Sequence, residues 1–426
     1  MKKNVMIVGN GGREHSLLWK LAQSNQVDKL FVAPGNGGTQ KIAKNICLND
    51  IIGLLKFAKE NCIDLTVVNQ EDLLSKGIVD IFQCHGLKIF GPACGAAHIE
   101  SSKYFAKSLM THNNIPTGAS QPIFNYDAGI KYIHTHGLPV VIKADGLANG
   151  KGAYVCRTIE KAEEVMHDLI IKKIYGDAGK MIIIEDFLEG SEISIHAFSD
   201  GKNFVLFPPS QDHKPIFDGD LGDNTGGMGT IAPVPWFSQN MLKEAGAKIV
   251  KPVLKRLSVI GNPFVGCLYP GLMMTPSGMM VLEYNARFGD PETQSYMRLL
   301  KTDLLNIFEA CINGTLDKCK IEWRPGFAVC IVLTSSGYPG AFKKGFPISG
   351  IEDAEKIPGV VIFHAGTTIE DGILKTYGGR VLNVTATGDT LKQALQRAYH
   401  AVDWIKFNGM HYRKDIGAKS LAMIKK

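Results

Sequence analysis

The stretch Val281–Ser295 reads Val-Leu-Glu-Tyr-Asn-Ala-Arg-Phe-Gly-Asp-Pro-Glu-Thr-Gln-Ser, an apolar lead-in followed by a dense run of polar side chains. Residues Met279–Tyr284 have the composition of a strand. On a strand, Glu283, Asn285 and Arg287 lie two residues apart and face one side. A carboxylate and an amide oxygen suit Mg²⁺, and Arg287 can hold a phosphoryl group beside them. An edge strand with a solvated polar face is the alternative.

Composition places the chain among globular proteins. It has 426 residues, of which 45% are hydrophobic, and this length favours about three domains. The formal net charge is +6, and there is no basic block or basic-aromatic patch of the kind that nucleic-acid-binding proteins carry. Anionic small molecules therefore fit better than nucleic acid as partners.

Cysteine usage and hydropathy bear on the compartment. The nine Cys residues include no Cys-x-x-Cys pair, which argues against a disulfide framework and a zinc site and predicts reduced, mostly buried thiols. The N-terminal apolar run is too short for a signal peptide, and no other run approaches a membrane span. We expect a cytoplasmic protein that does not bind membranes.

The N-terminus predicts a strand, a tight turn and the start of a helix. The apolar run Val5–Val8 enters Gly-Asn-Gly-Gly-Arg-Glu-His at residues 9–15, and a helical pattern follows. Backbone N–H groups and the helix dipole at such a turn favour a phosphate. The turn lacks the third glycine of the dinucleotide-binding motif, so a βα turn without a ligand is the alternative.

Further alternation of strands and helices predicts one α/β domain up to residue 102. Strand candidates are Lys29–Val32, Leu65–Val68 and Leu87–Phe90. The loop Asn69–Asp72 follows one of them, at the edge where open α/β sheets bind ligands.

A hairpin with a Gly-Lys tip follows a predicted helix over residues 103–112. The strand Leu138–Lys143 leads into Asp-Gly-Leu-Ala-Asn-Gly-Lys-Gly at residues 145–152, and Ala153–Cys156 reads as the next strand. A Walker loop needs Gly-Lys-Ser/Thr and a helix, so this is a different phosphate loop. Lys143 and Lys151 would bracket phosphates from two sides. Two surface lysines around a loose turn are the alternative.

An acidic segment follows an amphipathic helix predicted at Glu160–Lys172. The strand Met181–Ile184 runs into Glu-Asp-Phe-Leu-Glu-Gly-Ser-Glu at residues 185–192. Such a junction offers backbone groups to an adenine edge and a carboxylate to ribose hydroxyls. A solvated acidic loop is the alternative.

Residues 210–229 form a polar, Gly-rich stretch. A calcium loop is excluded, because counting from Asp218 places Asp223 where Gly is needed and Gly229 where Glu is needed. We expect a long structureless loop that binds substrate.

The sequence after residue 300 predicts a helix at Asp303–Asn313. A final domain follows, with predicted strands at Phe327–Leu333, Val360–His364 and Arg380–Thr387 and a predicted helix at Leu391–Trp404. Two Gly-bearing turns, at residues 364–367 and 378–380, could face a central cleft. The predicted domains are 1–102, 103–324 with a lid subdomain at about 120–190, and 325–426.

Taken together, these motifs resemble the glycinamide ribonucleotide synthetase (phosphoribosylamine-glycine ligase) family of ATP-grasp enzymes over essentially the whole length. The most specific blocks are Val8–His15, Ala33–Asn36, Lys143–Leu147, Gln211–Lys214, Asn224–Gly229, Glu283–Asn285, Arg287–Thr293 and His364–Thr367.

The resemblance implies an α/β fold with an N-terminal doubly wound parallel-sheet domain, a central ATP-grasp fold with a small lid, and a C-terminal α+β domain. It implies ATP-dependent joining of glycine to 5-phosphoribosylamine in purine biosynthesis, through glycyl phosphate, with Mg²⁺ or Mn²⁺. We expect a monomer or a weak homodimer.

The resemblance also assigns residues. ATP contacts are implied for Lys103, Lys143, Glu185, Leu188 and Glu192, to which the hairpin adds Lys151, and metal ligation for Glu283 and Asn285. Glycine and the reacting phosphoryl group map to Asp212, Arg287, Gly226, Gly227 and Met228, and the phosphoribosylamine phosphate to Asn10, Gly11 and Gly12. Arg287, Asp212 and Lys143 are the expected catalytic residues.

The chain departs from the family pattern in three places. Asn69–Leu74 replaces a Gly-Pro-Glu-x-Pro-Leu segment, Asp223 stands where Pro is common, and Asn149 where Ala is usual. Alternatives left open are another purine ligase of this fold, a nicotinamide-dependent oxidoreductase and a non-catalytic nucleotide sensor. The oxidoreductase accounts for the N-terminal turn alone.

Overall fold

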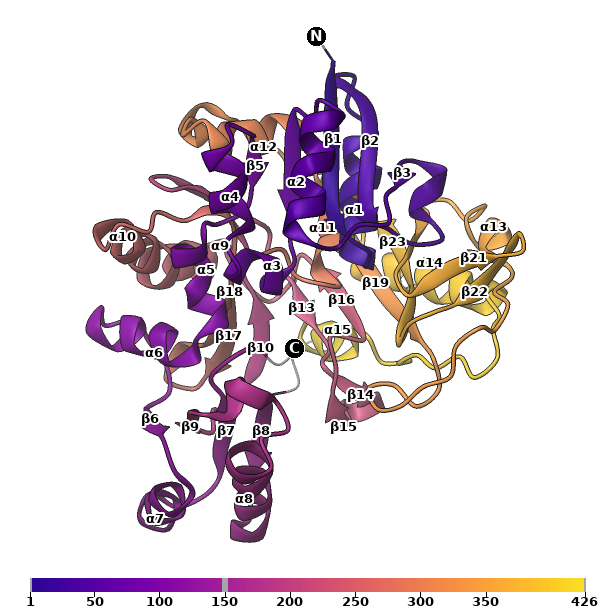
Figure 1. Cartoon of the computed structure of the whole chain (residues 1–426). Coiled ribbons are helices and arrows are strands. Elements are labelled where there is room, and N and C mark those ends of the chain that lie inside the picture. Colours follow the sequence, from indigo (N-terminus) through magenta and orange to yellow (C-terminus); the bar gives the residue numbers. More distant parts are fainter. Residues whose placement is uncertain (1, 148–151, 425–426) are drawn as a thin grey trace.

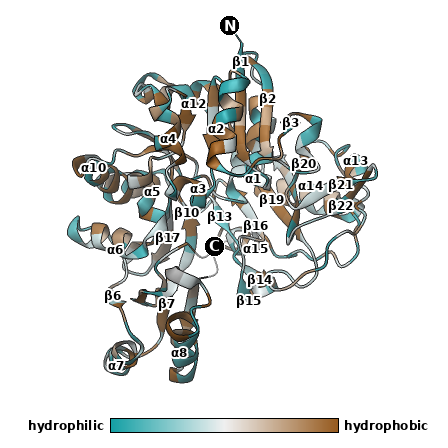
Figure 2. Ribbon diagram, in the orientation of Figure 1, coloured by the Kyte–Doolittle hydropathy of each residue, from teal (hydrophilic) through white to brown (hydrophobic). Residues whose placement is uncertain are grey.

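The structure, a computed structural model, describes residues 2–147 and 152–424 apart from the side chain of Asp177. The N-terminal part lies at the top of Figure 1, a narrow sheet with two helices projects at the bottom, and the C-terminal part lies to the right. Hydrophobic residues concentrate on the strands and on the inner sides of the helices, as Figure 2 shows. Within the described ranges, no helix is long and apolar enough to span a membrane.

The N-terminal sheet is parallel and has the strand order β3-β2-β1-β4-β5, which confirms the predicted parallel-sheet domain. Its central strand is buried from Val5 to Val8, as expected where both faces of a parallel sheet are covered. The elements are β1 (Lys3–Gly9), α1 (Gly12–Leu21), β2 (Val27–Pro34), β3 (Lys44–Asn45), α2 (Ile51–Glu60), β4 (Leu65–Val68), α3 (Glu71–Ser75), α4 (Ile78–Cys84), β5 (Ile89–Phe90) and α5 (Cys94–Ser101).

The start of α1 is packed against the C-terminal part of the chain. A Cβ atom on Gly12 would lie 2.2 Å from Asn383 Nδ2 and 2.7 Å from Gln294 Nε2, so only glycine fits there. Nearby, the His364 backbone N–H donates to His15 Nδ1 at 2.8 Å. Residues about 370 apart in sequence therefore meet at this turn.

A small antiparallel sheet, here called the lid sheet, has the order β6-β9-β7-β8 and a core of its own. The buried side chains of this core all come from residues 123–184. The helix before Lys172 is shorter than predicted, because a π-helical turn replaces its last part at His167–Ile171. The elements are β6 (Ser120–Ile123), α7 (Tyr126–His136), β7 (Val140–Ala144), β8 (Ala153–Cys156), α8 (Ile159–Met166) and β9 (Ile182–Asp186).

The central sheet faces the lid sheet and contains the predicted strand before Asn285. Strand β17 pairs with β10, β11 and β18, and β12 extends the sheet beyond β11. The elements of this part are α6 (Lys103–His112), β10 (Ser191–Ser194), β11 (Ala197–Asp200), β12 (Phe204–Leu206), α9 (Gln239–Ala245), α10 (Lys251–Val259), β17 (Val265–Thr275), β18 (Gly278–Asn285), α11 (Glu292–Leu299) and α12 (Leu304–Ile312).

A further antiparallel sheet, the C-terminal sheet, has the order β13-β16-β19-β23-β20. Two of its strands precede residue 233, so the sheet crosses the predicted domain boundary at residue 325. The elements are β13 (Gln211–Asp212), β16 (Gly229–Ala232), β19 (Phe327–Thr334), α13 (Ile351–Ala354), β20 (Val360–His364), β21 (Thr367–Glu370), β22 (Ile373–Thr376), β23 (Arg380–Gly388), α14 (Leu391–Trp404) and α15 (Ala418–Ile424).

The prediction of a structureless loop at residues 210–229 is wrong. After β13 the chain forms a hairpin of β14 (Pro215–Phe217) and β15 (Leu221–Asn224). The hairpin is held from the C-terminal segment, where the Arg413 guanidinium donates to Asp220 Oδ1 at 2.8 Å. The carboxylate of Asp415 also accepts from the Gly219 backbone N–H. Distant partners thus impose order that local composition does not reveal.

The expectation of mostly buried thiols is also wrong. Cys156, Cys267, Cys311 and Cys330 are buried, whereas the other five thiols are partly or fully exposed. All nine are free.

We predict that Gly12→Ala lowers the melting temperature by an amount that corresponds to about 1–3 kcal/mol, the usual cost of overpacking. The added methyl group would have to displace Asn383 and Gln294. Gly118→Ala is the matched control, because its Cβ would meet only ordinary contacts at 3.5 Å or more. Equal melting of the two variants would show that the packing at Gly12 is unimportant.

Candidate active site

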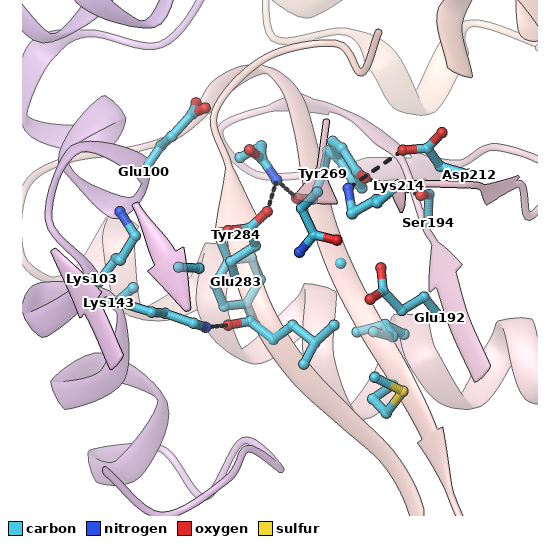
Figure 3. A pocket seen from close by; sticks show the side chains of 18 of the residues that line it. Glu100, Lys103, Lys143, Glu192, Ser194, Asp212, Lys214, Tyr269, Glu283 and Tyr284 are labelled. Atoms are coloured by element: carbon cyan, nitrogen blue, oxygen red, sulfur yellow. Dashed lines mark hydrogen bonds and ion pairs between the residues drawn. The ribbon is translucent and has the colours of Figure 1, made fainter. Parts of the chain in front are cut away.

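A cavity of about 470 Å³ lies between the lid sheet and the central sheet and extends toward the C-terminal sheet. Figure 3 shows Lys103 and Lys143 on one side of it, Glu283 near the middle, and Glu192, Lys214 and Asp212 on the other side. The residues predicted from the sequence that line the cavity are Lys103, Lys143, Glu185, Leu188, Glu192, Asp212, Gly226, Glu283, Asn285 and Arg287.

The remaining predicted residues lie elsewhere. Among the described residues, Gly227 and Met228 are buried behind the cavity wall, and Asn10, Gly11 and Gly12 stand outside its lining. The cavity does reach the neighbouring Arg13. Lys151 and the tip of the predicted hairpin lie outside the described residues.

Two lysines and one glutamate form a buried charge cluster at the lid end of the cavity. Glu185 Oε2 lies 3.0 Å from Lys143 Nζ and 2.9 Å from Lys107 Nζ. Burial alone would lower the pKa of Lys143, but the carboxylate outweighs it and the pKa is raised. The other oxygen, Glu185 Oε1, is buried and has no hydrogen-bond partner in the described part of the chain. A ligand with an N–H donor would satisfy it.

Lys103 provides a further cation from the first turn of α6. Its ammonium donates to the Gly146 carbonyl oxygen at 3.1 Å, at the start of the segment between β7 and β8. Burial lowers the pKa of Lys103, and the carboxylate of Glu283 opposes that effect. The ammonium groups of Lys103 and Lys143 therefore lie at the same end of the cavity, where an anion is favoured.

Glu283 and Asn285 lie together at the end of β18, as their spacing predicts. Asn285 Nδ2 is 3.5 Å from Glu283 Oε1, and Asn285 Oδ1 accepts from Arg287 Nη2 at 3.3 Å. Burial would raise the pKa of Glu283, but Lys214, Lys143 and Lys103 outweigh it and keep the carboxylate ionised. An ionised carboxylate beside an amide oxygen fits Mg²⁺, which completes its coordination with phosphate and water.

Arg287 lies two residues beyond the end of β18 and contacts carboxylates of the N-terminal part. Its Nη2 is 3.0 Å from Glu100 Oε1, and its Nε is 3.2 Å from Glu71 Oε2. Burial raises the pKa of Glu100. Burial would raise the pKa of Glu71 as well, but the guanidinium outweighs it and the pKa is lowered. Arg287, the predicted phosphoryl-binding residue, therefore already forms ion pairs with Glu71 and Glu100.

At the far end of the cavity, Lys214 is surrounded by acidic groups. Its Nζ is 3.5 Å from Asp212 Oδ2. The nearby Tyr269 and the carboxylates of Asp212, Glu192 and Glu292 raise the pKa of Lys214 although burial opposes them. Burial raises the pKa of Asp212 to about 7, with Lys214 opposing the rise. A carboxyl group with that pKa exchanges a proton near neutral pH.

Glu292 is fixed by hydroxyl groups below this end of the cavity. Its Oε1 accepts from Tyr269 Oη at 2.7 Å and from Ser194 Oγ at 2.9 Å. Burial lowers the pKa of the neighbouring His196 to about 3, so this imidazole is neutral. Its Nε2 accepts from the Gly289 N–H at 3.1 Å. The network holds Glu292 in one position next to Lys214.

The Gly226 loop, residues 225–228, forms one wall but uses its own amides internally. The Gly226 N–H donates to Tyr338 Oη at 3.0 Å, and the Gly227 N–H donates to Thr225 Oγ1 at 2.9 Å. The Met228 N–H donates to the His213 carbonyl oxygen. The amides of residues 226–228 are therefore occupied, and the loop contributes shape rather than free donors.

Several lining residues were not assigned a role from the sequence. Lys107 is four residues after Lys103 on the same helix face, a spacing that could have indicated it. Lys214 and Glu292 lie inside the quoted blocks, and Arg380 ends one of the Gly-bearing turns. Asp290 lies inside the same quoted block as Glu292, whereas Tyr269 and Glu100 carry no local signal, because their partners are distant in sequence.

The lid sheet and the central sheet, with lysines and carboxylates between them, lie mainly within residues 101–293, which match an ATP-grasp (A) domain. The crystal structure of a biotin carboxylase-βγ-ATP complex from Campylobacter jejuni has a TM-score of 0.74 and covers 100% of this chain and 96% of its own. Its identity of 14% means that this similarity shows the fold alone.

Sequence comparison narrows the class to one family. The chain matches the N domain of phosphoribosylglycinamide synthetase at residues 3–100, its ATP-grasp (A) domain at 101–293 and its C domain at 328–419. The chain belongs to the phosphoribosylglycinamide synthetase family.

Similar proteins have matching lengths. A phosphoribosylamine–glycine ligase from Caldanaerobacter subterraneus subsp. tengcongensis is 47% identical over 97% of this chain and 99% of its own. A phosphoribosylamine–glycine ligase from Halalkalibacterium halodurans is 45% identical, and the match covers 98% of this chain and 97% of its own. The crystal structure of phosphoribosylamine–glycine ligase from Thermotoga maritima has a TM-score of 0.82 at 33% identity and covers 97% of this chain and 100% of its own.

Proposed function

We propose that this protein is an ATP-dependent ligase that joins glycine to 5-phosphoribosylamine, giving glycinamide ribonucleotide, ADP and phosphate in purine biosynthesis. The observation that carries the proposal is a single cavity with a cationic end at Lys103 and Lys143, Glu283 and Asn285 in the middle, and the pair of Asp212 and Lys214 at the far end. Full-length relatives named phosphoribosylamine–glycine ligase support it.

ATP would occupy the end beneath the lid sheet. Lys103 and Lys143 would bind its phosphates, which the cationic character of that end favours. Glu185 Oε1, which is buried and lacks a partner among the described residues, would accept from the adenine amino group. Leu188 would contact the base, and the carboxyl group of Glu192 would bind the ribose hydroxyls.

Glu283 and Asn285 would hold Mg²⁺, or Mn²⁺, against the ATP phosphates. The ion neutralises phosphate charge and favours transfer of the terminal phosphoryl group. The amide oxygen of Asn285 has a second lone pair, so it can bind a cation while it accepts from Arg287.

The reaction would begin with transfer of a phosphoryl group to glycine. A glycine carboxylate oxygen attacks the terminal phosphorus of ATP, the bond to the bridging oxygen breaks, and ADP leaves with glycyl phosphate formed. Lys143, Lys214 and Arg287 supply positive charge around the transferred group, and a carboxylate becomes a reactive acyl phosphate.

Amide formation would follow at the Asp212 end. The amine nitrogen of phosphoribosylamine attacks the carbonyl carbon, and phosphate leaves with one former glycine oxygen. Asp212 would accept the proton that the nitrogen loses, which suits a carboxyl group whose pKa burial raises to about 7. Lys214 holds this carboxylate in place from 3.5 Å.

We predict that Glu283→Gln keeps the parent melting temperature and lowers turnover by at least about a hundredfold, as expected when a preorganised charge is removed from a transition state. ADP release with ATP, Mg²⁺, glycine and phosphoribosylamine generated in place measures it. Glu189→Gln is the control, because this carboxylate is exposed next to the cavity wall. Turnover within about threefold of the parent would exclude Glu283 as a metal ligand.

We predict that protonation of Asp212 makes kcat/KM fall on the acidic side of its pH profile. Because burial raises its pKa from 3.8 to about 7, the group is protonated below neutral pH and cannot accept a proton. We expect kcat/KM to fall about tenfold per pH unit below pH 7. Asp212→Asn should abolish this fall of kcat/KM at acidic pH and lower its maximal value. Asp223→Asn, a change at an exposed position, is the control and should leave the pH profile unchanged. An unaltered fall at acidic pH in Asp212→Asn would assign it to another group.

Glycine labelled with heavy oxygen in its carboxylate tests the acyl phosphate. One labelled oxygen must leave on inorganic phosphate for each amide formed. The amide keeps only one of the two carboxylate oxygens, so a route without an acyl phosphate, with ATP hydrolysed separately, would release the other labelled oxygen to water instead of to phosphate. Unlabelled phosphate beside formed amide, with solvent exchange excluded, would contradict the mechanism. Absence of product from the complete mixture would contradict the proposed function itself.

A further inference from the structure

Gly226 is held at both of its backbone polar groups by side chains of the C-terminal part. Its N–H donates to Tyr338 Oη at 3.0 Å, and its carbonyl oxygen accepts from Arg380 Nη1 at 2.7 Å. Tyr338 lies in the turn after β19, and Arg380 is the first residue of β23. Two side chains from separate segments therefore fix one exposed glycine at the cavity wall.

The position of this glycine determines the position of the next residue. Gly227 packs against the carboxyl group of Asp212, and a Cβ on Gly227 would lie 2.7 Å from Asp212 Oδ1. Thr225 Oγ1 accepts from the Gly227 N–H and donates to the Lys214 carbonyl oxygen at 2.7 Å. The Gly226 loop, Asp212 and Lys214 thus form one connected unit.

Arg380 makes this connection stiff. The same Nη1 that binds Gly226 also donates to the Asp290 carbonyl oxygen at 2.6 Å, and it lies 3.4 Å from the Asp290 carboxylate. Its guanidinium covers the Cα of Gly226, since a Cβ there would be 3.0 Å from Arg380 Cζ. The preceding residue, Gly379, has no room for a side chain because the Tyr338 ring lies against it.

We propose that Tyr338 and Arg380 are positioning residues for the ligase reaction. They act through the Gly226 loop, keeping it against Asp212 so that the acyl phosphate meets the amine and is shielded from water. This inference rests on the proposed function. Neither side chain needs to touch the reacting atoms.

Loosening the Gly226 loop should uncouple ATP consumption from amide formation. The ATP end of the cavity is unchanged, so glycyl phosphate still forms. Water then attacks its carbonyl carbon and releases glycine and phosphate, so ATP is consumed without amide formation. The ratio of ADP to glycinamide ribonucleotide reports this directly, and a general loss of folded enzyme does not change it.

Tyr338→Phe is the test, because it removes one hydroxyl group and keeps the ring against Gly379. Loss of one hydrogen bond corresponds to about a two- to tenfold effect. We therefore expect the excess of ADP over amide product to rise about two- to tenfold above that of the parent, with a raised KM for glycine and an unchanged KM for ATP. Tyr377→Phe is the matched control, a tyrosine of the same part of the chain that is 55% exposed.

Arg380→Lys provides a second, independent variant that keeps the charge but cannot hold Gly226 and Asp290 in the same geometry. It should also raise the ratio, with a melting temperature close to that of the parent. A ratio unchanged from that of the parent in both variants, or equal changes in Tyr338→Phe and Tyr377→Phe, would overturn the inference. If the parent enzyme forms no amide product, the proposed function fails first, and that outcome is distinct.

Discussion

The structure depends on the ion pairs of Arg287. This guanidinium follows the strand that carries Glu283 and Asn285, and it contacts Glu100 at 3.0 Å and Glu71 at 3.2 Å from the N-terminal part. Buried charges of this kind are costly when one partner is lost, about 3–5 kcal/mol, so the three side chains fix how the N-terminal part meets the central sheet. The same contact places Arg287 next to the cavity. Arg287 therefore both fixes the N-terminal part against the central sheet and supplies positive charge to the cavity.

Local sequence patterns predicted the bounds of several elements correctly. The strands Leu65–Val68 and Ala153–Cys156 and the helix Leu391–Trp404 have the predicted bounds, because apolar periodicity and the cap at Thr390 specify them within a few residues. The hairpin β14–β15 was missed, since Asp220 is held by Arg413, which is 193 residues away. No window of sequence contains both partners.

The same distinction applies to the candidate site. Period-two spacing placed Glu283, Asn285 and Arg287 together, and the structure brings them into contact. Spacing within one strand cannot reveal that Arg287 faces Glu100, nor that the glycine turn at the start of α1 is covered by Asn383 and Gln294. Because Asn383 and Gln294 pack against this glycine turn, it does not face a dinucleotide site, and this argues against the nicotinamide-dependent oxidoreductase alternative.

The separate core of the lid sheet has a mechanical consequence. Its buried side chains come from residues 123–184 and are shared with no other cluster in the described chain. The chain enters and leaves this unit at two neighbouring segments, which are tied by the Asp186 N–H donating to the Ala119 carbonyl oxygen at 3.0 Å and by the Ala119 N–H donating to Asp186 Oδ2 at 3.1 Å. Opening the cavity would leave the hydrophobic contacts inside the lid sheet intact. It would break polar contacts between this unit and the central part, such as Glu185 to Lys107 and Lys143 to the Leu282 carbonyl oxygen.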